Sequence, residues 1–542
     1  MKSLFLVTAL SAACSVAIAD EQPVRVFIFA GQSNMVGSDS KVADIENFPP
    51  FIGLDQPQPK VRFRYCIGRE NKTKSDGWVP LAPVSNIVGP ELSFARTVTT
   101  AIDAPIAIIK VAAGGTHLGG DWNPDNPSGF KMYPLALSFV QDSLAELKKE
   151  GVDYRVEGFM WHQGENDMFE EEYMANYGPN LKNYLSHWRK DLGEPKLKFY
   201  IGELCTKTIW GMDLRPRMYK ICTGQRSVTD QDPLAEYVPT SHVGVEIGNP
   251  VGLHYHYGTL GQLEHGMNYA HAYLDSIGKL PERKRKLKSW PYKNKETVKL
   301  FVLAGHRNME GERAFTDHIR ESDPDLLEDN HSIAYRYDVA AGYKKSTEWE
   351  PLGPAGLYQN FGPELSFAHA MLAKESSKFA VAKLTDSGSQ IIDWTPEGSE
   401  QAPKRNVYPR FIRFVTESVE QLEAKGQEVE LAGIFYHVGE NDMSFMPFRK
   451  GSAEHIRGMI ERSRVDLDMP GLKWFVSQQP PTNTEDLNKF DAVAPIEKLA
   501  SQDELVFHIR AFDLPKQPKR IVLDGRGVVA LGIKLAEAYS AQ

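Results

Sequence analysis

Apolar and polar positions follow two different patterns along the chain. Short apolar runs rich in Val, Ile and Phe are typical of buried parallel strands. In the first half these runs are Val24–Ala30, Pro105–Ala112, Arg155–Trp161 and Leu197–Ile201. Longer segments carry apolar residues at helical spacing with charges on the opposite face. They are Glu91–Ile102, Tyr133–Glu150 and Gly258–Ile277. Strands alternating with helices at this spacing predict a doubly wound α/β sheet.

The second half of the chain repeats the first. The residues Gly89–Ala95 recur identically as Gly362–Ala368, and Gly164–Met168 recurs as Gly439–Met443. The repeated motifs keep their order at a nearly constant interval, which predicts two tandem domains of one fold and not a solenoid. The predicted strands of the second half are Val298–Leu303, Phe379–Leu384, Glu430–Tyr436 and Lys473–Ser477.

Both the start and the middle of the chain carry boundary signals. Lys2 precedes an apolar run that ends in an A-x-A cleavage site, so residues 1–19 predict a signal peptide and a secreted or periplasmic protein. A lipidated Cys14 is the alternative, although a poor lipobox precedes it. Residues 279–296 are dense in Lys and Arg and predict an exposed linker. The two domains then span residues 20–278 and 297–542.

The composition excludes a mostly disordered chain, a collagen-like chain and a multi-span membrane protein. The 542 residues are 42 % hydrophobic and 25 % charged, as in ordinary globular proteins. A net charge of −9 gives no general attraction for nucleic acid or anionic membranes. The apolar leader is short for a membrane anchor, so stable membrane insertion is not expected. After cleavage Cys66, Cys205 and Cys222 remain, and Cys205–Cys222 is the disulfide considered. The oligomeric state stays open.

Two turns that follow predicted strands carry candidate chemistry. The carboxyl ends of parallel strands meet at one edge of a sheet, where such folds place their sites. Ser33 follows the first strand, and a sharp strand-to-helix turn there exposes its hydroxyl as a nucleophile; the alternative is a helix N-cap serine. Gly114 and Gly115 follow a later strand and allow a backbone N–H to approach a ligand closely. The alternative for them is a plain tight turn.

Two further loops complete the candidate set. The segment Trp161–Asp167 contains Gln163, whose amide can donate to an oxyanion, and Glu165, which can orient a histidine; the alternative is a polar network that holds the loop. His254 and His256 precede the closing helix, and a neutral imidazole there within reach of Ser33 is a candidate general base. A metal site built from His254, His256 and His162 lacks the usual ligand spacing, so no metal or other cofactor is expected.

Taken together, the four segments resemble the SGNH/GDSL-type esterases. The motifs G-Q-S-N-M, G-P-E, G-G-T, H-Q-G-E-N-D and a late histidine are most similar to the sialate O-acetylesterase-like and acetylxylan-esterase-like carbohydrate esterases, over nearly all of residues 22 to 278. The resemblance implies two tandem flavodoxin-like α/β/α domains with parallel sheets, and metal-free hydrolysis of acetyl esters on sugars. It also implies that Ser33 is the nucleophile and His256 the base. The oxyanion hole is then formed by the N–H groups of Ser33 and Gly114 with the Gln163 side chain.

The sequence departs from this family at the third member of the triad. Many members carry an Asp three residues before the histidine, where this chain has Leu253. Glu165 is the candidate acid, and a Ser–His dyad is the alternative. Ser33 and His256 are expected to lie within hydrogen-bonding distance. The residues after the G-G-T turn that are candidates for sugar binding are His117, Trp122 and Asn123, with a plain packing role as the alternative for Trp122.

The second half differs from the first at all four chemical positions. Arg307, Ser387, Val438 and Val522 stand where Ser33, Gly114, Gln163 and His256 stand in the first half. Arginine has no accessible neutral form for nucleophilic attack, so the second domain is expected to be non-catalytic and Arg307→Ala to keep turnover. Glu165 has a counterpart in this domain, Glu440, which favours a role in holding the loop.

The sequence therefore predicts a serine esterase that removes O-acetyl groups from a carbohydrate through an acetyl-enzyme. The hypothesis from another class is a carbohydrate-binding protein in which both halves are non-catalytic. Which acetylated glycan is the substrate stays open.

Overall fold

The computed structural model describes most of the chain. The described residues are 22–69, 73–206, 208–209, 212–244, 256–281, 285–396, 407–444, 446–479, 493–515 and 521–542. The predicted signal peptide and Cys14 lie outside them, as do Leu253 and His254.

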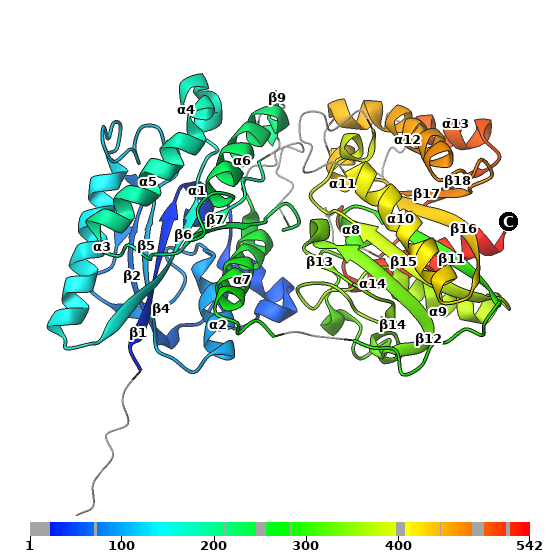
Figure 1. Cartoon of the computed structure of the whole chain (residues 1–542), viewed down its shortest axis with the longest axis horizontal. Coiled ribbons are helices and arrows are strands. Elements are labelled where there is room, and N and C mark those ends of the chain that lie inside the picture. The colour runs from blue at the N-terminus through cyan, green and yellow to red at the C-terminus, as the bar shows by residue number, and fades with distance from the viewer. Residues whose placement is uncertain are drawn as a thin grey trace, which may run out of the picture.

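Two lobes lie side by side, the first drawn from blue to green and the second from green to red (Figure 1). Each lobe is built on an eight-stranded sheet. The first sheet has the order β10-β7-β6-β1-β5-β2-β3, with β4 beside β2. Its strands are β1 (Val24–Gly31), β2 (Gln58–Ile67), β3 (Thr73–Lys74), β4 (Val79–Leu81), β5 (Ile106–Ala112), β6 (Tyr154–His162), β7 (Phe199–Gly202) and β10 (Ala235–Val238). Strands β3 and β4 run antiparallel to β2, and the other pairs are parallel.

The strand order is that of a flavodoxin-like sheet with one addition. Taken in chain order, β1, β5, β6, β7 and β10 lie in the sequence 2-1-3-4-5 across the sheet. Strand β2 extends this sheet beyond β5. The chain reverses direction of winding at β1, which lies between β5 and β6. Ligand sites in such sheets form at this switch point, outside the carboxyl ends of the strands.

Helices cover both faces of the first sheet. They are α1 (Ser33–Val36), α2 (Glu91–Ala101), α3 (Met132–Lys149), α4 (Glu171–Ala175), α5 (Tyr177–Asp191), α6 (Arg215–Thr229) and α7 (Gly258–Ser276). Along β1, Val26 and Ile28 join the core under α3, α5 and α6, whereas Phe27 and Phe29 join the core under α2 and α7. The lobe is therefore an α/β/α sandwich, as the sequence predicts.

The second lobe repeats this architecture. Its sheet has the order β13-β12-β15-β11-β16-β17-β18, with β14 beside β12. The strands are β11 (Thr297–Gly305), β12 (Asn330–Val339), β13 (Lys344–Lys345), β14 (Glu350–Leu352), β15 (Lys378–Thr385), β16 (Glu428–His437), β17 (Trp474–Gln478) and β18 (Val506–Arg510). The helices are α8 (Arg307–Glu310), α9 (Glu364–Lys374), α10 (Val407–Ala424), α11 (Glu440–Ser444), α12 (Met446–Asp466), α13 (Val493–Gln502) and α14 (Gly525–Ser540).

The seven-residue repeat is a helix-packing motif. Gly266 of α7 lies so close to α2 that an added Cβ would overlap the carbonyl oxygen of Pro90 and the hydroxyl of Ser93. In the second lobe Gly532 of α14 lies in the same way against Pro363. The repeated residues therefore hold equivalent helix pairs together, which explains why they persist in both halves.

Part of the predicted linker is packed and not exposed. The guanidinium of Arg285 donates to the carbonyl oxygens of Pro351 at 2.6 Å and Gly353 at 3.1 Å. Tyr292 is buried, and its hydroxyl donates to the carbonyl oxygen of Phe379 at 2.6 Å. From residue 285 onward, the described part of this segment therefore belongs to the second lobe, because its long polar side chains satisfy backbone carbonyls there.

The Cys205–Cys222 disulfide considered above is not formed. Both residues are buried thiols, as is Cys66. The Sγ of Cys222 donates to the carbonyl oxygen of Leu204 at 3.3 Å. Among the described residues no helix combines the length and the apolar character needed to cross a bilayer.

Candidate active site

The turn that carries Ser33 is fixed by the neighbouring strand β6. Gly31 ends β1 with φ 152°, and a Cβ there would overlap the carbonyl oxygen of His162. The next N–H, of Gln32, donates to that same oxygen at 3.0 Å. Ser33 then begins α1 and is partly exposed. The serine therefore lies at the carboxyl end of β1, at the switch point of the sheet.

The Gly114–Gly115 turn lies directly beside Ser33. An added Cβ at Gly114 would lie 3.5 Å from the Cβ of Ser33. Gly115 has φ 71°, a conformation that favours glycine. Arg69 holds the turn from outside, because its Nε donates to the carbonyl oxygen of Gly114 at 2.8 Å. The structure thus brings together the two backbone segments proposed for the oxyanion hole.

His256 is held near this turn by two hydrogen bonds. Its Nδ1 lies 2.6 Å from Oδ2 of Asp39. The N–H of the next residue, Tyr257, donates to Oδ1 of Asn34 at 3.1 Å. Asn34 follows Ser33 directly, so the last loop of the lobe meets the first. The described side chains of Ser33 and His256 are not hydrogen-bonded to each other. Catalytic hydrogen bonds are often long before substrate binds and tighten in the complex.

The second lobe contains the same link between its first and last loops. The Oδ1 of Asn308 accepts a hydrogen bond from the N–H of Leu523 at 2.7 Å. These residues match Asn34 and Tyr257, so Val522 occupies the position of His256 and Arg307 that of Ser33. Because the link persists where the chemical groups are absent, it is a property of the fold.

The carboxylate that contacts His256 is that of Asp39, which the sequence did not reveal. Asp39 has φ 61°, a left-handed conformation that Asp tolerates better than most residues. Its side chain is 65 % exposed, so it meets His256 from the solvent side. No motif marks this position, and only the contact across 217 residues of sequence identifies it.

Glu165 has other partners. Its Oε1 accepts a hydrogen bond from Nδ2 of Asn34 at 2.6 Å and lies 3.5 Å from Nε2 of His162. Burial opposes ionisation, but the bonds from His162 and Asn34 outweigh it and lower the pKa of Glu165. Glu440 of the second lobe lies at the same 3.5 Å from its own histidine, His437. These contacts favour a role for Glu165 in holding the loop, and the two histidines considered as metal ligands, His162 and His256, meet separate carboxylates.

Gln163 is committed to the interior. It is fully buried, and its Nε2 lies 3.0 Å from Oε1 of Gln32, 2.9 Å from the carbonyl oxygen of Thr116 and 2.5 Å from Oδ2 of Asp167. An amide nitrogen has two hydrogens, and these three acceptors already exceed them. The side chain therefore has no N–H left for an oxyanion, in contrast to the donor role expected from the sequence. Its hydrogen bond to Gln32 instead links the loop of Gln163 to the turn that carries Ser33.

Trp122 is a core residue and not a sugar platform. Its side chain is fully buried, its Nε1 donates to Oγ1 of Thr116 at 3.0 Å, and its ring meets Trp161 edge-on at 5.2 Å. A ring enclosed on all sides offers no face to a sugar.

The other two candidate sugar-binding residues lie nearer the surface. The side-chain oxygen of Asn123 caps a turn, since it accepts from the N–H of Asp125 at 3.0 Å. The ring of His117 is 28 % exposed and lies 5.5 Å from that of Tyr173. A hydrogen bond with Asp121 raises the pKa of His117, against the opposing effect of burial. Of the three candidates, His117 has the geometry of a residue that a ligand can reach.

The altered positions of the second lobe are filled and enclosed. Arg307 is 2 % exposed and makes a two-pronged ion pair with Glu312, at 2.6 and 2.7 Å. Ser387 donates its hydroxyl to the carbonyl oxygen of His242 at 2.8 Å. Val438 and Val522 are buried. The Arg307 side chain is therefore enclosed within the protein.

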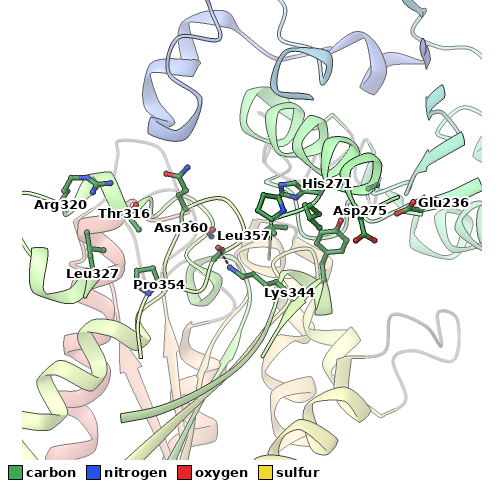
Figure 2. A pocket seen from close by; sticks show the side chains of 16 residues that line it. Glu236, His271, Asp275, Thr316, Arg320, Leu327, Lys344, Pro354, Leu357 and Asn360 are labelled. Atoms are coloured by element: carbon green, nitrogen blue, oxygen red, sulfur yellow. Dashed lines mark hydrogen bonds between the residues drawn. The ribbon is translucent and has the colours of Figure 1, made fainter. Parts of the chain in front are cut away.

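A cavity of about 890 Å³ lies where the two lobes meet (Figure 2). Its lining includes Glu236, His271, Asp275 and Lys344. Burial and the neighbouring Asp275 raise the pKa of Glu236 to about 7. His271 lies on α7 roughly 20 Å along the helix from its start. The cavity is therefore separate from the Ser33 turn, and none of the proposed site residues lines it.

Comparisons with known proteins identify the family of the chain. The family model described as carbohydrate esterase, sialic acid-specific acetylesterase (SASA) matches residues 23–275 and again residues 297–541. A probable carbohydrate esterase of Arabidopsis thaliana is 25 % identical over 187 residues, which span 32 % of this chain and 66 % of that protein, just under two thirds of its length.

Solved structures also match. A novel carbohydrate acetylesterase from Xanthomonas citri is 16 % identical with a TM-score of 0.33, and the match covers 46 % of this chain and 56 % of that one. The crystal structure of NanS is 15 % identical with a TM-score of 0.36, covering 48 % of this chain and 98 % of that one.

Proposed function

Because the chain belongs to the carbohydrate esterase family of sialic acid-specific acetylesterases, we propose that its first lobe is a serine esterase that removes O-acetyl groups from carbohydrates. The observation that carries this proposal is the meeting of the first and last loops. The bond from Tyr257 to Asn34 and the contact of His256 with Asp39 hold an imidazole near the Ser33 turn. We also propose export of the mature protein, on the signal peptide that residues 1–19 predict.

In the proposed mechanism, His256 takes the hydroxyl proton of Ser33 as Oγ attacks the acetyl carbonyl carbon. The carbonyl electron pair moves onto oxygen, and the backbone N–H groups of Ser33 and Gly114 stabilise that oxyanion. The intermediate collapses, the bond to the sugar oxygen breaks, and His256 gives its proton to that departing oxygen, which becomes the free sugar hydroxyl. Water, deprotonated by His256, then attacks the acetyl-enzyme and releases acetate with recovery of the serine.

Asp39 takes the orienting role in this scheme. A carboxylate that accepts a hydrogen bond from Nδ1 of His256 fixes the tautomer in which Nε2 is free to act as base, and stabilises the imidazolium that forms. The assignment of this role to Glu165 from the sequence is accordingly replaced. Glu165 instead steadies Asn34, which in turn binds the backbone next to His256.

The test is turnover of p-nitrophenyl acetate and of acetylated glycans by purified protein. We expect Ser33→Ala to lower kcat by at least about 10³-fold, because the residual rate comes from binding and the oxyanion hole alone. Ser227→Ala removes an exposed hydroxyl on α6 and serves as the matched control. Equal turnover by wild type and Ser33→Ala would eliminate the mechanism. A panel of acetylated xylans and acetylated sialic acids identifies the substrate by acetate release.

The other candidate is a carbohydrate-binding protein without turnover. The observations that favour it are the missing hydrogen bond between the described Ser33 and His256 side chains and the commitment of Gln163 to the interior. Calorimetry with an acetylated oligosaccharide, followed by acetate analysis of the same sample, separates the two. Binding heat with no acetate released supports the binder, whereas acetate release supports the esterase.

A further inference from the structure

The second lobe contacts the segment Ser241–Gly244, which precedes the loop of His256 in the chain. Ser387 donates its hydroxyl to the carbonyl oxygen of His242 at 2.8 Å. Gly388, the next residue, lies so close that an added Cβ would overlap the carbonyl oxygen of Ser241. Ser387 and Gly388 occupy the place that Gly114 and Gly115 occupy in the first lobe. The turn that would form an oxyanion hole in the second copy is therefore used to contact the first copy.

His242 packs against two rings of the second lobe. Its imidazole stacks on Tyr343 and Tyr358, at centroid distances of 5.3 and 6.0 Å and interplanar angles of 14° and 9°. Its Nε2 lies 2.8 Å from the hydroxyl of Tyr358, which donates to Oδ1 of Asn268 on α7 at 2.6 Å. Stacking and hydrogen bonding together fix this part of the first lobe against the second.

Gly244 links this contact to the first turns of α7. The N–H of Gly244 donates to Oε2 of Glu264 at 2.6 Å. From the second lobe, Glu312 lies so near that an added Cβ at Gly244 would lie 2.9 Å from its Oε1. Burial, reinforced by the charge of Glu312, raises the pKa of Glu264 well above its usual range. Helix α7 begins at Gly258, two residues after His256. The position of its N-terminal turns therefore sets the position of the histidine.

Arg307, which stands where Ser33 stands in the first lobe, stabilises this contact. Arg307 binds both oxygens of Glu312, and both side chains are 2 % exposed. Without Arg307 the Glu312 carboxylate would be a buried charge without its main partner, close to a second carboxyl at Glu264. Such a loss is strongly destabilising in a low-dielectric interior. Arg307 has thus become part of the surface that faces the first lobe.

A third contact reaches the segment that follows Asp39. The guanidinium of Arg313 lies 5.5 Å from the ring of Phe48, and the ring of Phe315 meets Phe48 edge-on at 6.3 Å. Phe48 lies nine residues after Asp39, the partner of His256. The second lobe therefore touches each of the three segments around the histidine: the residues before its loop, the helix after it and the chain of its acidic partner.

We infer that the second lobe is a built-in partner that positions the catalytic histidine of the first. The region of the second lobe that matches the proposed active site of the first, with Arg307, Ser387 and Gly388, forms a docking surface for Ser241–Gly244 and the start of α7. The inference rests on the proposed function for its effect on turnover, and it assigns the second copy a role in that reaction without chemistry of its own. His242, Glu312 and Arg307 are positioning residues, because they act through the backbone around His256.

The experiment is a wedge between the lobes in the full-length chain. Gly388→Ala adds one methyl group whose nearest atoms all belong to Ser241 of the first lobe, so the lobes must separate to admit it. Gly458→Ala adds the same methyl group to α12, where no atom lies within 4 Å, and is the matched control. We expect Gly388→Ala to lower kcat for p-nitrophenyl acetate at least tenfold with KM changed less than threefold. Gly458→Ala should match wild type.

Hydrogen exchange measured on peptides covering residues 256–264 gives a readout that does not need activity. We expect faster exchange there in Gly388→Ala than in Gly458→Ala. Ser387→Ala, which removes a single hydroxyl, carries the test if Gly388→Ala fails to fold, with an expected kcat loss of several-fold. Arg307→Ala should also lower turnover, in contrast to the expectation from sequence alone.

The two proposals fail in different ways. A wild-type chain that releases no acetate overturns the proposed function, while the exchange comparison still tests the positioning. A folded Gly388→Ala protein whose kcat and exchange both equal those of Gly458→Ala overturns the positioning role.

Discussion

At the scale of single residues, the carboxylate that contacts His256 comes from the segment after α1. Many family members carry an acid three residues before the histidine, whereas this chain has Leu253 at that position. Here Asp39, from the opposite end of the domain, contacts His256. What the imidazole needs is an acceptor at Nδ1, and the position of that acceptor in the sequence does not matter. Its exposure reduces its electrostatic strength relative to a buried triad acid.

We therefore predict that Asp39→Asn lowers kcat by about 10- to 100-fold, less than the loss in enzymes whose triad acid is buried. KM should stay within threefold, because Asp39 is not proposed to touch the substrate, and Asp39→Glu should recover part of the rate. The measurement is steady-state kinetics on p-nitrophenyl acetate. A fully active Asp39→Asn protein would return the orienting role to another group.

The candidate site could be predicted from sequence only where a motif and a strand end coincide. Ser33 and Gly114 follow predicted strands, so the edge of the sheet brings them together. Gln163 and Trp122 stand in equally suggestive positions, but their environment comes from other loops, and those loops enclose them. Asp39 carries no local signal at all. Burial is set by tertiary packing, which a local pattern does not contain.

At the scale of helices, glycines decide how closely two of them approach. Gly266 lets α7 lie against the first turn of α2, as Gly532 does for α14 and α9. Glycine in a helix interior normally costs about 1 kcal/mol relative to alanine. Its presence at both positions is explained by the contact and not by helix propensity.

We predict that Gly266→Ala lowers Tm although alanine favours the helix, because relieving the overlap with Pro90 costs about 1–3 kcal/mol. Gly458→Ala is the control, since its methyl group meets no atom and should raise stability by about 0.5–1 kcal/mol. Thermal unfolding followed by circular dichroism compares the two. A Gly266→Ala protein as stable as the control would mean that the helices can move apart at no cost.

The elements that sequence patterns identify are the fully buried ones. The predicted runs match β1, β5, β6 and β7 closely, because strands covered on both faces read as continuous apolar segments. Strand β2 was missed because basic residues alternate with apolar ones along it, and it lies next to the edge of the sheet. Strand β10 has only four residues, too few for a periodic signal.

At the scale of the whole molecule, the contact between the lobes depends on uncharged imidazoles. Burial lowers the pKa of His242 to about 4, reinforced by nearby His271 and opposed by Glu203 and a hydrogen bond with Asn268. The rings of Tyr343 and Tyr358 that stack on it supply no compensating charge. The unfolded chain takes up this proton near pH 6.5, so the stability that His242 contributes is complete above that pH. It is lost as the pH falls from 6.5 toward 4, by about 3 kcal/mol at most.

We predict that Tm falls between pH 7 and pH 5, and that the fall is smaller in His242→Asn, which has no titrating group at this position. Carboxyls with a raised pKa, such as Glu236, act in the opposite direction and are shared by both proteins. The comparison of wild type with His242→Asn therefore isolates the imidazole. An identical pH dependence of Tm in the two proteins would contradict it.

Ser33 is the proposed nucleophile of the first lobe, and active-site labelling tests this role most directly. Folded wild-type protein is treated with a fluorophosphonate, digested, and the modified peptide is mapped by mass spectrometry. We predict a single adduct on Ser33, blocked by prior incubation with an acetylated substrate, and none in the second lobe. An unlabelled folded protein, or an adduct on another residue with Ser33 untouched, would contradict the account.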